Sequence, residues 1–178
     1  MKNEGWNEAG IPLAYLFTFR CYGTWLHGDE RGAVDRFNNK YEMPFLPPNN
    51  KWQRFVESRL KYEPVKLNGR MRKSVETAVE ETCQIRGWNI YAVNVRTNHC
   101  HSVVDIGNES SKKALNALKA NATRQMREDG WWPFDHSPWA EKGSRRFLWT
   151  EKSIEMAIDY VVNGQGKPLP DFNCQDEQ

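Results

Sequence analysis

The chain has 178 residues, 39% of them hydrophobic and 12% aromatic, which is enough to bury a core and excludes a disordered chain. Its formal net charge of +2 is too small to indicate a nucleic-acid-binding protein on its own. No apolar run approaches the roughly 20 residues of a transmembrane helix, and residues 1–9 lack the apolar core of a signal peptide.

We therefore expect one domain over residues 1–178 with no membrane segment, a core at about 12–166, and terminal extensions at 1–11 and 168–178. The four cysteines are widely spaced and form no Cys-x-x-Cys pair, which predicts reduced core thiols in a cytoplasmic protein. They are Cys21, Cys83, Cys100 and Cys174.

The first predicted element is a strand from Ala14 to Tyr22, which is apolar and aromatic along almost its whole length. Such continuous apolar character is typical of a central strand that is buried on both faces. Residues 27–50 follow as a long irregular stretch with several Gly, Asn and Pro turn signals. A loop of this length in a compact domain is often functional, although a surface excursion without a role explains it equally well.

Two helices are predicted next. Apolar residues at helical spacing indicate a short helix over residues 52–60 and a longer one over residues 69–86. Asn68 is positioned to cap the longer helix, and Gly87 is positioned to end it. A run of β-branched and aromatic residues at 89–95 then predicts a strand.

Two of the four histidines lie two positions apart, at His99 and His101, directly before a second apolar strand segment at residues 102–106. Side chains alternate along a strand, so both imidazoles are expected on one face and Cys100 on the other, in the core. The imidazoles are then about 6–7 Å apart, twice the rise per residue, and can share one metal ion. A histidine pair on a half-exposed strand without a ligand is the alternative.

The next predicted helix starts at Ser110 or Ser111 and extends to about Glu128, and an aromatic loop follows at residues 131–139. Segment 110–150 carries eight Lys and Arg residues against four acidic ones, a local charge of +4. This predicts a modest basic patch. On charge alone, a helix face that simply contacts solvent is the preferred explanation.

Residues 142–146 are interpreted as a basic turn that leads into a short strand at 147–149, after which Thr150 caps a final helix over 151–163. The order is then β-α-β-β-α-β plus one helix. It predicts an α+β, ferredoxin-like fold: an antiparallel sheet with helices on one face and a C-terminal helix that carries a tyrosine.

That tyrosine, Tyr160, lies off the apolar stripe of the final helix. At 100° per residue it is roughly 100° from the centre of the stripe, so it is not needed to pack the helix. Tyr160 is therefore a candidate nucleophile that faces a metal site, and a tyrosine lying along the helix flank is the alternative. The stripe consists of Ile154, Ala157, Ile158, Val161 and Val162.

The Asn-His-Cys-His element, the order of strands and helices, and the tyrosine on the final helix together resemble the Y1 transposases. These are HUH (His–hydrophobic–His) single-strand DNA endonucleases of the insertion-sequence 200-like family, which include the REP-associated tyrosine transposases. The resemblance spans about residues 12–166. It is also carried by residues 15–20, 23–29, 144–149 and 160–165.

The resemblance implies a specific chemistry. His99 and His101 would hold Mg²⁺ or Mn²⁺ beside a phosphodiester of single-stranded, hairpin-forming DNA. Tyr160 would attack the phosphorus to form a 5′-phosphotyrosine link and a free 3′-OH, and a second 3′-OH would reverse the step and rejoin strands. Such an enzyme is a transposase or a domesticated relative, and acts as a monomer or a homodimer. The candidate DNA-binding residues are Lys112, Lys113, Lys119, Arg145 and Arg146.

One feature departs from the family pattern. Members often supply a third metal ligand, frequently Gln, four positions after the tyrosine, where this chain has Gly164. Gln165 is the fifth position and would lie about 140° from Tyr160 on a regular helix. It is a candidate ligand if the helix breaks at Gly164, and His27 and Asp29 are weaker candidates.

Two other functions remain open. The chain is alternatively a catalytically inactive relative that binds a DNA hairpin, or a metallohydrolase in which the histidine pair activates water. The retained tyrosine and both histidines argue against the first of these, and the position of Tyr160 off the stripe argues mildly against the second.

Overall fold

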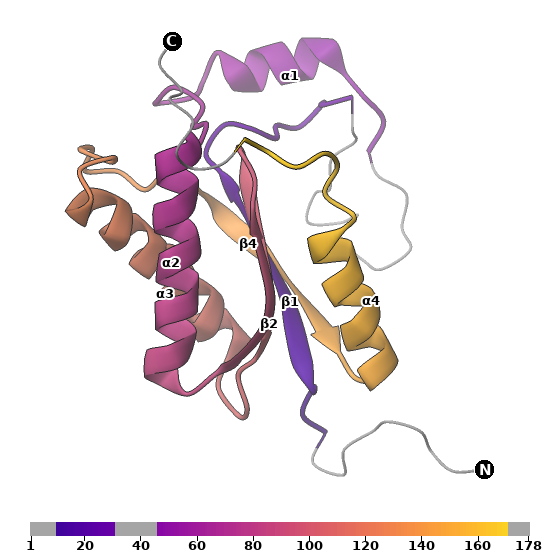
Figure 1. Ribbon diagram of the computed structural model, residues 1–178. Coiled ribbons are helices and arrows are strands. Elements are labelled where there is room, and N and C mark those ends of the chain that lie inside the picture. Colours follow the sequence, from indigo (N-terminus) through magenta and orange to yellow (C-terminus); the bar gives the residue numbers. More distant parts are fainter. Residues whose placement is uncertain (1–9, 31–45, 171–178) are drawn as a thin grey trace.

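The computed structural model describes residues 10–30 and 46–170, which form one antiparallel sheet with helices on both faces (Figure 1). From one edge of the sheet to the other, the strands are β2 (Asn89–Val95), β3 (His99–Asp105), β1 (Ala14–Cys21) and β4 (Trp139–Leu148). In these ranges no helix is both long and apolar enough to cross a membrane. The predicted α+β order of strands and helices is confirmed, including the short helix that precedes the longer one. The elements are β1 (Ala14–Cys21), α1 (Asn50–Glu57), α2 (Gly69–Arg86), β2 (Asn89–Val95), β3 (His99–Asp105), α3 (Ser111–Glu128), β4 (Trp139–Leu148) and α4 (Glu151–Val162).

β1 and β3 form the centre of the sheet. β1 pairs with β3 on one side and with β4 on the other, and most of its side chains are buried, as its apolar sequence predicts. The register places Thr18 opposite His101 and Arg20 opposite His99. Directly paired residues of antiparallel strands project from the same face, so these four side chains share one face of the sheet.

α2 and α3 cover the other face and enclose the main core. Phe17 and Phe19 of β1 meet Val75 of α2 and Leu118 of α3 there, and all four are fully buried. Burial of each large apolar side chain contributes about 1.5–3 kcal/mol. Cys100 of β3 lies in the same core, so it projects away from the histidines on either side of it, as the alternation predicts.

Cys21, Cys83 and Cys100 are buried free thiols, whereas Cys174 lies outside the described residues. Burial raises the pKa of Cys21 to about 12 and that of Cys83 to about 11. Thiols with such pKa values stay protonated and unreactive near neutral pH. The three buried cysteines therefore act as small apolar side chains.

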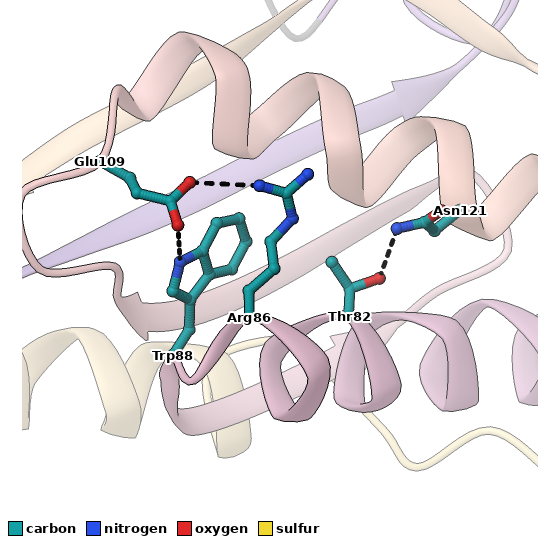
Figure 2. A network of polar contacts seen from close by, with 5 residues as sticks. All are labelled: Thr82, Arg86, Trp88, Glu109 and Asn121. Atoms are coloured by element: carbon teal, nitrogen blue, oxygen red, sulfur yellow. Dashed lines mark hydrogen bonds and ion pairs between the residues drawn. The ribbon is translucent and has the colours of Figure 1, made fainter.

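The end of α2 is tied to α3 by polar contacts as well as by the core. In Figure 2, Glu109 accepts hydrogen bonds from Trp88 Nε1 at 3.0 Å and Arg86 Nη1 at 3.2 Å, and Asn121 donates to Thr82 Oγ1 at 2.9 Å. These polar side chains therefore form hydrogen bonds with one another and join α2 to the region of α3.

α2 also begins and ends where its sequence predicts. Asn68 Oδ1 accepts from the Met71 N–H at 2.9 Å, and Gly87 adopts the left-handed conformation, with φ of 68°, that ends the helix.

α4 packs on the opposite face over a smaller core. A capping box between Thr150 and Ser153 starts the helix, and Asn94 Nδ2 donates to the Val161 carbonyl at 2.9 Å, which fixes the last turn against β2. The core beneath α4 lies on the same face of the sheet as Thr18 and His101. It consists of Ala14, Leu16, Ala92, Val103, Leu148, Ile154, Ala157 and Val161.

The predicted basic turn at residues 142–146 is wrong, whereas the strand predicted at 147–149 is the end of a longer one. Instead of a basic turn and a short strand, Trp139–Leu148 is one edge strand with a register irregularity between its partners Phe19 and Cys21. Gly143 permits this pairing, because a Cβ there would come within 2.8 Å of the Thr18 carbonyl oxygen. Charged residues are common on an edge strand, where they discourage pairing with other chains.

The first short helix also differs from its prediction. α1 spans Asn50–Glu57 instead of residues 52–60, and it has no buried residue, so the side chains of its apolar stripe, including Trp52 and Phe55, are largely exposed. Most of the predicted loop at 27–50 lies outside the described residues, which resume at residue 46.

Candidate active site

The two histidines of β3 meet on the face that α4 covers. The ring centroids of His99 and His101 are 4.6 Å apart, with the rings inclined at 69°. This is closer than the separation expected along the strand, because the two side chains lean toward each other. The structure therefore brings the two predicted metal ligands together.

The Nδ1 atom of each imidazole is within hydrogen-bond distance of an oxygen of a neighbouring side chain. His99 Nδ1 lies 2.7 Å from Asn98 Oδ1, and His101 Nδ1 lies 2.7 Å from Thr18 Oγ1. With Nδ1–H donating to these oxygens, each Nε2 keeps its lone pair. Such hydrogen bonds orient metal-binding imidazoles and select the tautomer that can bind.

His101 is held in its neutral form. Burial lowers its pKa to about 4, and the nearby His99 and Arg20 act in the same direction because a second positive charge there would be repelled. Only 7% of the residue is exposed. At neutral pH the imidazole is therefore unprotonated, which metal binding requires.

Tyr160 of α4 contacts His101 of this pair. Its ring centroid is 5.3 Å from that of His101, with the rings at 69°, and 46% of the residue is exposed. The apolar stripe of α4 explains this position: Ile154 and Val161 are buried, while Tyr160 lies on the flank that faces β3. A phenol at this place is next to the histidines and still open to solvent.

Gln165 also reaches the histidines. α4 ends at Val162, and at Gly164 the backbone passes so close to Tyr160 that a Cβ would lie 2.7 Å from the Tyr160 carbonyl oxygen. The Gln165 amide donates from Nε2 to that carbonyl at 3.0 Å, which turns its Oε1 toward His99 Nε2 at 3.2 Å. The break in the helix therefore brings Gln165 back to the site, as the glycine suggested.

The weaker candidates do not join the site. Among the described residues, no group of three or more His, Cys, Asp or Glu side chains is arranged to hold a metal ion. His27 instead stacks on Trp52 of α1, with ring centroids 5.3 Å apart. Asp29, two residues after His27, is buried. The set that could hold a cation thus consists of His99 Nε2, His101 Nε2 and Gln165 Oε1.

Sequence analysis gave no role to three residues that surround the pair. Thr18 and Asn98 orient the imidazoles, and Arg20 lies opposite His99 with its guanidinium 3.4 Å above the centre of the Trp25 ring. Positions 18 and 20 alternate with the core residues Phe17 and Phe19, so their placement on the histidine face was available from the strand pattern.

The five predicted DNA-binding residues do not form one patch around the site. Lys112 and Lys113 are exposed on α3, across the sheet from the histidines, and Arg145 donates to Ser111 Oγ at 3.2 Å on that same side. Lys119 Nζ donates to the Ala140 and Glu141 carbonyls and so joins α3 to β4.

Arg146 is the exception. It is paired with Leu16 of the α4-side core and therefore projects from the histidine face. Arg146 is therefore the only one of the five that the register places on the histidine face.

The family model described as "Transposase IS200 like" matches residues 55–156, more than half of the chain, a range that includes both site histidines. No curated protein matches the sequence.

Two solved structures are similar in fold. One is a REP-associated tyrosine transposase bound to a REP hairpin, with a TM-score of 0.45 and 12% identity over 85% of this chain and 66% of that one, just under two thirds of its length. The other, a protein from Deinococcus radiodurans R1 described as a candidate transposase, has a TM-score of 0.44 and 11% identity over 94% of this chain and 99% of its own.

Proposed function

The chain belongs to the family of IS200-like transposases, and from this premise we propose that it nicks and rejoins single-stranded, hairpin-forming DNA through a covalent 5′-phosphotyrosine intermediate. Tyr160 is the proposed nucleophile, and His99, His101 and Gln165 are the proposed ligands of a divalent metal ion.

The observation that carries this proposal is the meeting of four side chains from two distant segments. His99 and His101 come from the middle of the chain, whereas Tyr160 and Gln165 come from its last helix and the turn after it. None of these contacts is needed to pack α4, whose apolar stripe lies elsewhere. A nucleophile beside a set of metal-binding atoms is the arrangement that phosphodiester transfer needs.

The donor set fits a divalent ion. The Gln165 Oε1 and His99 Nε2 atoms are 3.2 Å apart, close to the roughly 3 Å between neighbouring ligands that each bind at about 2.1 Å. Gln165 would supply an amide oxygen of the kind that Mg²⁺ and Mn²⁺ prefer, and the two imidazoles would supply nitrogen ligands. When bound, the ion would polarise the phosphodiester and offset the charge that grows on its oxygens.

The residues of this chain perform the remaining tasks. The Tyr160 oxygen forms a bond to phosphorus while the bond from phosphorus to the 3′ oxygen breaks, so the 5′ side stays attached to the protein and the 3′ side leaves as an alcohol. Because the new link is again a phosphate diester, a second 3′-OH can displace the tyrosine and join strands. The neighbouring Arg20 and Arg146 supply positive charge for the DNA backbone.

The proposal is tested by incubating the protein with a labelled pool of single-stranded hairpin oligonucleotides and Mn²⁺, followed by denaturing gel electrophoresis. A retarded protein–DNA band is expected from the native protein and not from the Tyr160→Phe or His99→Ala variants. Tyr91→Phe is the matched control, because Tyr91 is similarly exposed, at 40% against 46%, but lies on β2 outside the described site. That variant should form the adduct normally.

Other outcomes would assign the alternatives. Cleavage without a retarded band would mean that water is the nucleophile, as in a metallohydrolase. Binding of the oligonucleotides with neither cleavage nor adduct would leave a DNA-recognition module.

A further inference from the structure

A second feature at the same end of the sheet is an aromatic cavity of about 680 Å³. One wall is the segment from Tyr62 to Lys66, which precedes α2, and the other is the loop from Trp132 to His136, which follows α3. The four aromatic rings that line it form one contact group, in which Trp132 meets both Phe134 and His136 edge-on, at 4.8 and 5.3 Å, and His136 contacts Tyr62. These residues take no part in the site described above.

The two walls are joined by a ring stack. The Tyr62 and His136 rings lie parallel within 6°, with centroids 3.6 Å apart. Phe134, at the edge of the cavity, is 52% exposed, so a large apolar ring in the described part of the chain is left without full cover. Flat rings with exposed faces are the surfaces on which nucleobases stack.

The cavity is rigidly built. Arg127 Nη2 donates to the carbonyls of Phe134 and Asp135 at 2.9 Å each, and Trp132 Nε1 donates to the His136 carbonyl at 2.8 Å. These bonds fix the loop in the shape that forms the cavity wall. A site that is preformed in this way loses little entropy when a ligand binds.

Tyr22, directly after β1, fastens both walls to the sheet. Its N–H donates to the Pro138 carbonyl at 2.8 Å, its carbonyl accepts from Val65 N–H at 2.9 Å, and its hydroxyl accepts from Lys61 N–H at 3.0 Å. The preceding residue, Cys21, donates from its N–H to the Asn98 carbonyl at 2.8 Å. The cavity is therefore attached to the sheet next to the segment that carries the histidine pair.

The short path between the two sites supports a common ligand. Arg20 of β1 is opposite His99, and Tyr22 follows two residues later, directly after the end of β1, at most about 7 Å further along the chain. The walls of the cavity pack with the α2/α3 core, whereas the histidines project from the α4 face, so a nucleotide strand that contacts both passes around this end of the sheet.

The charges favour a base over a phosphate as the occupant. Glu63 and Asp135 line the cavity, and their carboxylates repel phosphate but accept hydrogen bonds from the amino and imino groups of bases. Lys66 also lines it, and Lys61 Nζ lies 5.2 Å from the centre of the Tyr62 ring, which provides cations for the backbone.

We infer that this cavity binds a nucleobase of single-stranded DNA, stacked against Phe134 and the Tyr62–His136 pair, beside the phosphodiester at the histidine site. The inference rests on the proposed function for the identity of the ligand as DNA. The cavity would be a second binding site, formed next to the α2/α3 core at the end of the sheet, separate from the histidines and Tyr160 on the α4 face.

The test measures binding of fluorescein-labelled oligo(dC) of ten nucleotides and of an abasic decamer with the same number of phosphates, at one salt concentration and in EDTA. We expect the native protein to bind oligo(dC) more tightly than the abasic strand. Phe134→Ala should weaken oligo(dC) binding about fivefold or more, the equivalent of about 1 kcal/mol for a lost base–aromatic stack, and leave the abasic strand unaffected.

Phe147→Ala is the matched control. Phe147 is similarly exposed, at 48%, but is paired with Tyr15 at the opposite end of β1. It should change oligo(dC) binding less than twofold. Thermal melting of both variants checks that they remain folded.

The inference is overturned if Phe134→Ala binds oligo(dC) as the native protein does, if it weakens both strands equally, or if the native protein does not distinguish the two strands. Binding of a proline-rich peptide that depends on Phe134, without such an effect on oligo(dC), would also overturn it and assign the cavity to a protein partner. Adduct formation is measured in parallel, so that normal adduct formation with an unaltered Phe134→Ala affinity would reject the cavity alone and leave the proposed function standing.

Discussion

The two faces of the sheet are made from the same strands but are completed in different ways. On the α2/α3 side, Cys100 and Val104 of β3 are packed among aromatic and aliphatic side chains, and the polar groups at the edge bind one another. On the α4 side, His99 and His101 of the same strand lie among hydroxyl, amide and guanidinium groups, and the adjacent Tyr160 is half exposed.

The difference shows how one strand contributes both to the core and to the candidate site. Because side chains alternate along β3, successive residues point in turn into the α2/α3 core and toward the candidate site. The large core can then hold the strand in place while the other face carries groups that do not pack well. Substitutions on the α2/α3 face are therefore expected to change stability, and substitutions on the α4 face to change activity.

The largest effect is expected from Phe17→Ala. Phe17 is fully buried in the α2/α3 core and stacks on Tyr15, with ring centroids 5.5 Å apart. Removing the ring should lower the free energy of unfolding by about 3–5 kcal/mol through lost burial and the cavity left behind. Urea denaturation followed by circular dichroism measures the change. A loss below about 1 kcal/mol would show that this face is not the main source of stability.

Thr18→Val tests the neighbouring position on the other face. It keeps the shape of the side chain but removes the hydroxyl that lies 2.7 Å from His101 Nδ1. Loss of such an orienting partner typically reduces metal affinity about 10- to 100-fold. The amount of Mn²⁺ needed for half-maximal adduct formation should rise accordingly, with little change in the urea midpoint. An unchanged Mn²⁺ requirement would mean that Thr18 does not orient the site.

The free energy of unfolding should also depend on pH through His101, which lies on the α4 face. The pKa of His101 is lowered to about 4 by burial, whereas in the unfolded chain it is near 6.5. Between these values the unfolded state binds more protons, so the stabilising contribution is fully present above pH 6.5 and is lost as the pH falls toward 4.

Urea titrations in EDTA at several pH values measure this dependence. In the His101→Gln variant the decrease in stability between pH 6.5 and 4 should be smaller than in the native protein. An equal decrease would place the responsible groups elsewhere in the molecule.

The same contrast separates what the sequence could predict from what it could not. Alternation along β3 predicted the histidine pair and the buried Cys100, and the apolar stripe of α4 predicted that Tyr160 lies to one side. These are local patterns, and they depend only on the period of a strand or a helix. The caps Asn68 and Thr150 were predictable for the same reason.

Features that depend on contacts between distant segments were missed. Gly143 resembles a turn residue in the sequence, but it is needed where β4 passes close to the Thr18 carbonyl. The side of the sheet reached by Arg145 and Arg146 follows from the register with β1, which no local pattern reveals. The position of Gln165 likewise depends on how the chain turns after Val162. In the sequence, only Gly164 indicated that the helix could end there and allow Gln165 to reach the histidines.

The smallest effect is expected from Ser102→Ala, which sharpens the comparison with Thr18. Ser102 is fully buried on β3, opposite Phe17, and its hydroxyl has no hydrogen-bond partner among the residues that the structure describes. A buried hydroxyl without a partner costs stability, so removing it should leave the free energy of unfolding unchanged or raise it by up to about 1 kcal/mol.

Adduct formation by Ser102→Ala should equal that of the native protein. The Ser102 and Thr18 hydroxyls lie on adjacent central strands, but only the Thr18 hydroxyl contacts a histidine. If Ser102→Ala instead reduced adduct formation as Thr18→Val is expected to do, the two faces would not act separately. Such a result would mean that a change in the α2/α3 core affects the histidine site through the paired strands β1 and β3.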